Sequence, residues 1–86
     1  MTHRYYKRPW DESRGGAFDA WGRSLWYFEV DDDGYPVRQI EQYENGRVLR
    51  YDANHVEDEY GGLGDQPLDL PDFASFEITG KEFAAA

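Results

Sequence analysis

The sequence predicts a small α+β domain: an antiparallel β-meander of three to four strands, a long acidic loop and a short C-terminal helix. The tight-turn signals Asp33-Gly34 and Asn45-Gly46 separate segments rich in aromatic and β-branched residues, which is typical of β-hairpins. Thr79 followed by Glu82 forms a capping box and predicts the start of a helix. With 86 residues, the chain is long enough for one domain with a modest core.

Each strand of the meander is bounded by turn residues. The strands are predicted at residues 24–30, 37–43 and 47–51, preceded by an edge strand at 4–10 and followed by a fourth strand at 73–78. We therefore expect one domain over residues 1–86, divided into an edge strand and a loop (1–23), the meander (24–51), the acidic loop (52–72), and a strand with a short helix (73–86).

The strand register is predicted from the two turns. If each is a two-residue loop, Glu29 lies opposite Arg38 and Glu41 lies opposite Arg50, so both hairpins pair opposite charges. Because side chains alternate along a strand, this register also assigns the two faces of the sheet. One face would carry Leu25, Tyr27, Ile40, Leu49 and Tyr51, and the other Trp26, Phe28, Val30, Val37, Tyr43 and Val48.

The charge of the chain is strongly negative. Eighteen acidic residues against nine basic ones give a net charge of −9, and no Lys or Arg lies between Arg50 and Lys81. Such a field repels nucleic acid and anionic membranes and attracts basic protein surfaces. The sequence therefore predicts a protein partner with a basic surface, and neither nucleic acid nor a membrane.

The loop predicted at residues 52–72 is the candidate binding region. A loop of about twenty residues is unusual in so small a domain and is often functional. Its carboxylates would pair with Lys and Arg of a partner, and its larger side chains would serve as buried anchors. The predicted partner-binding residues are Asp52, Glu57, Asp58, Glu59, Tyr60, Leu63, Asp65 and Asp69.

No pattern of catalytic or metal-binding residues stands out. The serines and the two histidines, His3 and His55, lack the sequence context of a hydrolytic triad. The run 55–59 gathers a histidine and three acids but lacks the histidine spacing of a zinc protease. In Asp31-Asp32-Asp33-Gly34, aligning Gly34 with position six of a calcium loop puts Ile40 at position twelve. We therefore predict no catalytic residue, no metal, no cofactor and no enzymatic activity.

Parts of residues 24–70 resemble a small, acidic bacterial domain family of unknown function. The resemblance rests on Trp26-Tyr27-Phe28-Glu29-Val30-Asp31-Asp32-Asp33-Gly34, Val37-Arg38-Gln39-Ile40-Glu41, Asn45-Gly46-Arg47, Arg50-Tyr51-Asp52, His55, Asp58-Glu59-Tyr60-Gly61 and Leu63. It implies the same kind of sheet domain of under about 100 residues. The resemblance implies no particular activity.

Two functions are compatible with these features. The first is an inhibitor or immunity-type module that covers a basic surface of its partner through the acidic loop. The alternative is an accessory or assembly domain that self-associates, or docks on a larger protein, through its aromatic sheet. The absence of cysteine and of any long apolar run, together with the polar start of the chain, predicts a cytoplasmic protein.

Overall fold

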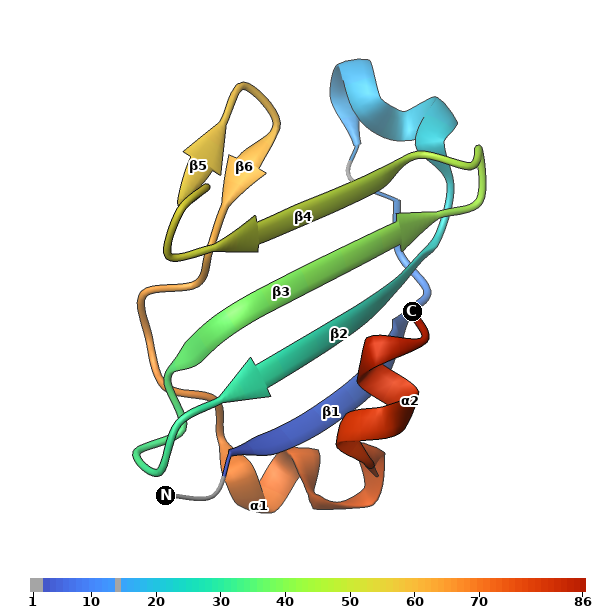
Figure 1. Cartoon of the computed structure of the whole chain (residues 1–86). Helices are drawn as coiled ribbons and strands as arrows, with labels where there is room; N and C mark the ends of the chain where they lie inside the picture. The colour runs from blue at the N-terminus through green and yellow to red at the C-terminus, as the bar shows by residue number, and fades with distance from the viewer. Residues whose placement is uncertain (1–2, 14) are drawn as a thin grey trace.

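The computed structural model describes residues 3–13 and 15–86, so positions 1, 2 and 14 of the predicted N-terminal region lie outside the described residues. Its main feature is a five-stranded antiparallel sheet with the order β4-β3-β2-β1-β7 (Figure 1). The elements are β1 (Arg4–Trp10), η1 (Gly16–Trp21, a 3-10 helix), β2 (Ser24–Val30), β3 (Pro36–Tyr43), β4 (Val48–Asp52), β5 (Glu57–Asp58), β6 (Gly61–Gly62), α1 (Leu70–Phe73), η2 (Ala74–Phe76, a 3-10 helix), β7 (Glu77–Ile78) and α2 (Gly80–Ala84). The predicted fold class, a small α+β domain built on an antiparallel meander, is confirmed.

Two strands differ from the prediction in position or in length. β1 has the predicted bounds but lies inside the sheet, because the short β7 pairs with it on the side away from β2. The strand predicted at 73–78 is reduced to Glu77–Ile78. Asp69 caps a helical turn, α1, before it, with a proline in the first turn, and this start commits residues 70–76 to helical geometry.

The β2–β3 hairpin has the predicted register, with Glu29 opposite Arg38. Its turn, however, is longer than two residues: the amide of Asp31 donates to the carbonyl of Tyr35, and the amide of Gly34 donates to the carbonyl of Asp31. An irregularity between Glu29 and Val30 shifts the pairing back by one residue. The longer loop and the bulge offset each other, so the register is right although the predicted turn is wrong.

The predicted register of the β3–β4 hairpin is wrong by one residue. Glu41 pairs with Leu49 rather than with Arg50. The amide of Gly46 donates to the carbonyl of Tyr43, and Gly46 has a φ of 91°, which is the three-residue loop ending in a left-handed glycine. A shift of one residue turns every side chain of a strand to the other face. Val48 is consequently exposed, while Leu49 and Tyr51 are buried on the face that the prediction gave to Val48.

Both faces of the sheet are covered. We call the face on which α2 packs the α2 face; in Figure 1 this helix lies in front of the sheet. Its buried core is formed by Tyr27, Ile40 and Phe83. The opposite face, which we call the loop face, is covered by α1, η1 and residues 60–70, and it carries two clusters: Tyr6, Phe28, Val30 and Phe73, and Trp21, Tyr43, Leu49 and Tyr51.

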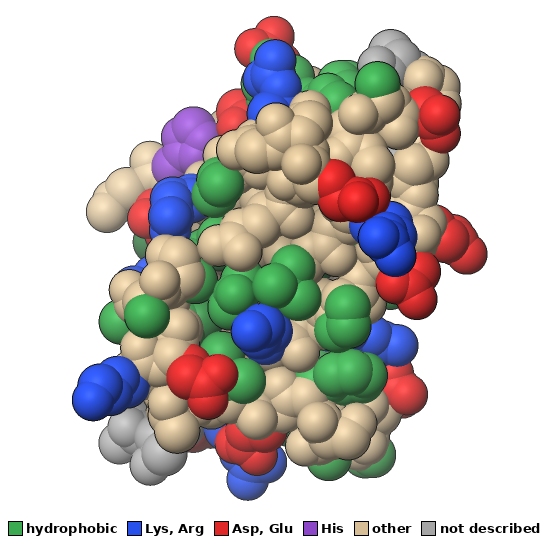
Figure 2. All heavy atoms as spheres, turned by 90° about the vertical axis from the view of Figure 1, so that its right-hand side faces the viewer, with side chains coloured by type: hydrophobic (Ala, Val, Ile, Leu, Met, Phe, Trp, Pro, Cys, Tyr) green, Lys and Arg blue, Asp and Glu red, His purple; other side chains and the backbone are tan. Residues whose placement is uncertain are grey.

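The surface is mixed in character. Figure 2 shows hydrophobic side chains grouped near the middle of the side that is on the right in Figure 1, with acidic and basic side chains around them. Large hydrophobic side chains that remain exposed are Trp10, Tyr35, Val48 and Val56. Among the described residues, no helix has the length and apolar character needed to cross a membrane.

Candidate functional site

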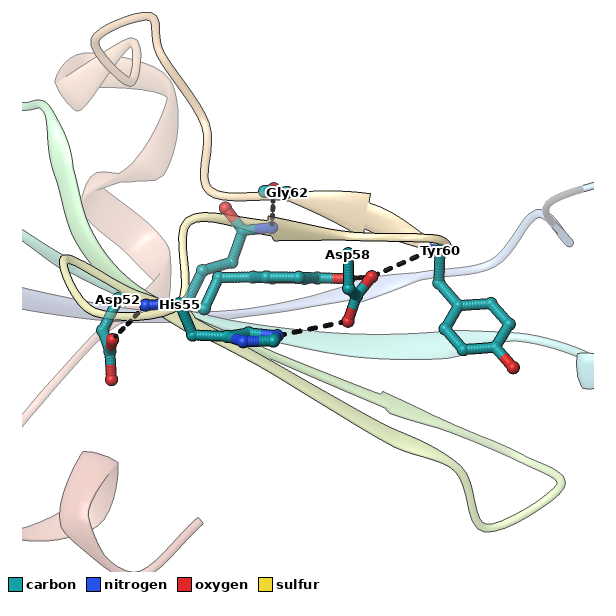
Figure 3. A network of polar contacts seen from close by, with 7 residues as sticks. Asp52, His55, Asp58, Tyr60 and Gly62 are labelled. Carbon is teal, nitrogen blue, oxygen red and sulfur yellow. Dashed lines mark hydrogen bonds and ion pairs between the residues drawn. The ribbon is translucent and has the colours of Figure 1, made fainter.

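Asp58 is the centre of a hydrogen-bond network that shapes the predicted acidic loop (Figure 3). Its Oδ1 accepts from the amide of Tyr60 at 2.8 Å and from the hydroxyl of Tyr51 at 2.9 Å, and its Oδ2 lies 3.3 Å from Nε2 of His55. The hydrogen bond from the Tyr60 amide lowers the pKa of Asp58, helped by Tyr51 and His55 and opposed by partial burial. This carboxylate therefore holds the β5–β6 hairpin together.

Asp52 and Asp69 also stabilise turns of their own segment. Oδ1 of Asp52 accepts from the amides of Asn54 and His55 at 2.8 and 3.0 Å. Oδ1 of Asp69 accepts from the amide of Asp72 at 3.4 Å at the start of α1. Like Asp58, these two predicted binding residues have structural bonds within the loop.

Tyr60 and Leu63, predicted as anchors for a partner, are half-buried and pack on the cluster around Trp21. The ring centroids of Tyr60 and Trp21 are 5.3 Å apart, and the guanidinium carbon of Arg47 lies 5.6 Å from the Tyr60 ring. These contacts attach the hairpin to the sheet. The hairpin is thereby held in place by its own aromatic side chain.

The other three predicted residues form what we call the acidic triplet: Glu57, Glu59 and Asp65. All three are exposed, and none of their side chains has a hydrogen bond or ion pair with another residue in the part of the chain that the structure describes. Glu57 lies in β5, Glu59 follows it in the turn, and Asp65 follows β6. The triplet is thus the portion of the predicted site that remains available to a partner.

Gln39, which the sequence did not indicate, links this segment to the sheet. Gln39 is only 3% exposed. Its Nε2 donates to the carbonyl of Gly62 at 3.3 Å and to Oε2 of Glu41 at 2.7 Å. Its Oε1 accepts from the amide of Gly64 at 3.1 Å. Figure 3 shows the bond to Gly62. One side chain on β3 therefore fixes residues 62–64 over the loop face.

A groove of about 410 Å³ lies between the loop and the sheet. Among its lining residues are Trp26, Phe28, Glu41, Tyr60, Asp65 and Leu68. Glu41 is only 4% exposed, and its Oε1 accepts from the hydroxyl of Tyr43 at 2.5 Å. The cation predicted to pair with it, Arg50, lies on the α2 face and donates to the carbonyl of Ala86 at 3.3 Å. The predicted Glu41–Arg50 pair is therefore wrong, and Glu41 belongs to the groove.

Glu29, the other buried glutamate of the meander, has cationic partners. It is 7% exposed on the α2 face, where its carboxylate bonds to Nε of Arg38 and lies 2.6 Å from Nδ1 of His3. Burial acts to raise the pKa of Glu29, but the hydrogen bonds from His3 and Arg38 outweigh it and lower the pKa.

This arrangement predicts a pH dependence of stability. Because folding lowers the pKa of Glu29 from its ordinary value of 4.5, the ionised group stabilises the fold above that pH, and the stabilisation is lost as pH falls below it. The difference in unfolding free energy between the wild type and Glu29→Gln should shrink between about pH 6 and pH 3 in urea titrations. Glu12→Gln, an exposed control with the same charge change, should show no such trend.

The grouping of the polar side chains decides whether the described residues could hold a metal ion. Within residues 3–13 and 15–86, no three His, Asp or Glu side chains are grouped so as to hold a metal ion. The run 55–59 is divided by its fold: His55 bonds to Asp58, while Glu57 and Glu59 are exposed. The candidate site therefore consists of carboxylates on a hydrogen-bonded segment, next to a groove that is lined in part by aromatic side chains.

Comparison with known proteins finds no matching family model, no matching curated protein and no matching solved structure. The resemblance to a bacterial domain family thus stays a prediction.

Proposed function

We propose that this chain is a non-enzymatic protein-binding module whose acidic triplet and adjoining groove cover a basic surface of a protein partner, as an inhibitor or immunity-type protein does. The observation that supports the proposal is that the carboxylates of the loop fall into two groups, those that bond within the loop and those that do not. Asp52, Asp58 and Asp69 bond within the loop, whereas Glu57, Glu59 and Asp65 are exposed on a segment that those bonds and Gln39 hold in shape.

Two physical consequences favour binding by this surface. A segment that is already ordered loses little conformational entropy when a partner binds, so more of the contact energy appears as affinity. A negative field over the whole span between Arg50 and Lys81 speeds the approach of a basic partner, and this effect weakens as salt rises. The partner is therefore expected to be basic and to be released by salt.

The proposal is tested by capture from a lysate of the source organism, with elution in a rising salt gradient and identification by mass spectrometry. The wild type is compared with the triple variant Glu57→Gln, Glu59→Gln, Asp65→Asn. The matched control neutralises three exposed acids elsewhere, Glu12→Gln, Asp32→Asn and Asp33→Asn. We expect a basic protein to bind the wild type and the control but not the triple variant. Equal retention by all three proteins would rule out the triplet as the binding surface.

The alternative, docking or self-association through aromatic side chains, is favoured by one observation. Trp10 is 48% exposed beside an apolar hollow of about 160 Å³ lined by Arg8, Trp26, Phe28 and Phe73. Sedimentation equilibrium tests the self-associating form of this alternative. A stable dimer that is insensitive to salt and is lost in Trp10→Ser would support assembly, whereas a monomer at all concentrations would exclude self-association through this hollow.

A further inference from the structure

Glu41 is a buried carboxylate whose partners are neutral. Gln39 and Tyr43 each donate one hydrogen bond to it, and no Lys, Arg or His of the described residues forms an ion pair with it. Buried charges in proteins are usually paired, as Glu29 is with Arg38 on the other face of the same sheet. A carboxylate has about four acceptor positions, so two hydrogen bonds leave room for a further donor. Glu41 thus lacks a cation at a position that lines a groove.

The walls of the groove suit a guanidinium group. Trp26 and Phe28 lie side by side with ring centroids 6.0 Å apart, and no cation of the described residues lies over either ring. Elsewhere the protein places its own arginines over rings, with Arg8 at 4.8 Å from the Phe73 centroid and Arg38 at 4.9 Å from that of Phe83. A guanidinium is planar and more weakly hydrated than an ammonium group. It can therefore stack on aromatic rings and donate two hydrogen bonds to one carboxylate.

The volume of the groove and the negative charge along its lining are both suited to a guanidinium group. Its volume of about 410 Å³ lies near the lower end of the range of about 300–1,000 Å³ for ligand sites in proteins. Asp65 of the acidic triplet stands among its lining residues, so a cation approaching the triplet meets negative charge on the way to Glu41.

We propose that this groove receives an arginine side chain of the protein partner, with Glu41 as its buried counter-ion and the Trp26–Phe28 wall against its guanidinium plane. The inference rests on the proposed function, because the arginine belongs to the basic partner. It adds a specific contact at the centre of the binding surface, of the kind that dominates affinity in protein interfaces.

The test is a titration of the ¹⁵N-labelled protein with the peptide acetyl-Gly-Arg-Gly-amide, followed by NMR. The side-chain amide of Gln39 and the backbone amides of Gly62 and Gly64 surround the groove and serve as reporters. A peptide with citrulline in place of arginine has nearly the same shape without the charge, and a lysine peptide has the charge without the planar group. Glu41→Gln keeps the size of the side chain and removes its charge, and Glu12→Gln removes the same charge from an exposed position outside the proposed binding surface.

We expect saturable shifts of these reporters with the arginine peptide, and binding at least about tenfold weaker for the citrulline peptide, for the lysine peptide and for Glu41→Gln. Glu12→Gln should bind within about twofold of the wild type. Reporter shifts that are absent, or equal for the arginine and citrulline peptides, would overturn the inference using the wild type alone, even if Glu41→Gln failed to fold. Equal binding of the lysine peptide would overturn the assignment to a guanidinium. If the triplet variant loses its captured partner but Glu41→Gln retains it at full affinity, the inference fails and the proposed function stands.

Discussion

Replacing Phe83 with alanine is expected to lower the free energy of unfolding by about 3–5 kcal/mol, the largest effect of any single change considered for this domain. Phe83 is 2% exposed and completes the α2-face core with Tyr27 and Ile40. Its ring also lies 5.4 Å from that of Tyr5 and beneath the guanidinium of Arg38. Because α2 has only five residues, it is too short to persist without this contact.

Urea unfolding followed by circular dichroism and tryptophan fluorescence measures this loss. Lys81→Ala is the matched control, since Lys81 lies on the same helix but is exposed, and its effect should stay within about 0.5 kcal/mol. A Phe83→Ala protein as stable as the control would show that the helix contributes little to the fold. Since domains of this kind have total stabilities of about 5–15 kcal/mol, the expected loss is a large part of the free energy of unfolding.

The second large effect is expected for Gln39→Ala. Removing this side chain leaves the Gly64 amide, the Gly62 carbonyl and Oε2 of Glu41 each without the partner described above. A buried polar group that loses its partner costs about 1–3 kcal/mol, so we expect a destabilisation of about 2–3 kcal/mol. Because the Gly64 amide would lose its acceptor, its hydrogen exchange should also accelerate by at least about tenfold.

A matched control lies on the same strand. Gln42 is also on β3, but it faces the α2 side and has none of these bonds, so Gln42→Ala should leave the exchange of Gly64 unchanged. If both variants accelerate exchange equally, the loop is loosened by general destabilisation, and Gln39 is not the specific link between loop and sheet. Exchange should be read by NMR under conditions in which both variants remain folded.

The fold could be predicted to the extent that it depends on local patterns. Turn residues delimited the strands of the meander, and the Thr79 cap marked α2, where its Oγ accepts from the Glu82 amide. The register of the second hairpin depends on whether the Asn45-Gly46 turn takes two or three residues. A two-residue loop and a three-residue loop can both contain Asn-Gly, so the sequence alone does not decide between the two lengths. Treating Gly46 as the left-handed residue that closes a three-residue loop gives the observed pairing.

The candidate site was predictable only in part for a related reason. A run of acids shows where negative charge gathers, but it does not show which carboxylates fold back onto their own backbone. Asp52 and Asp69 bond to amides two or three residues ahead, as short acidic side chains often do in turns and helix caps. The long-range contact of Gln39 with residues 62–64 has no local signature. Glu41 lies on the loop face in the predicted register as well, and the shift of β4 by one residue only moves its predicted partner Arg50 to the other face.

The measurement that tests the central claim most directly is the salt dependence of affinity for the captured partner. Isothermal titration calorimetry at about 50 and about 300 mM NaCl spans the range in which exposed charges become screened. We predict that the wild type binds more weakly at the higher salt, and that the triple variant Glu57→Gln, Glu59→Gln, Asp65→Asn binds weakly at both with little salt dependence. Equal affinity of the two proteins at both salt concentrations would contradict the claim that this domain binds a basic surface through its acidic triplet.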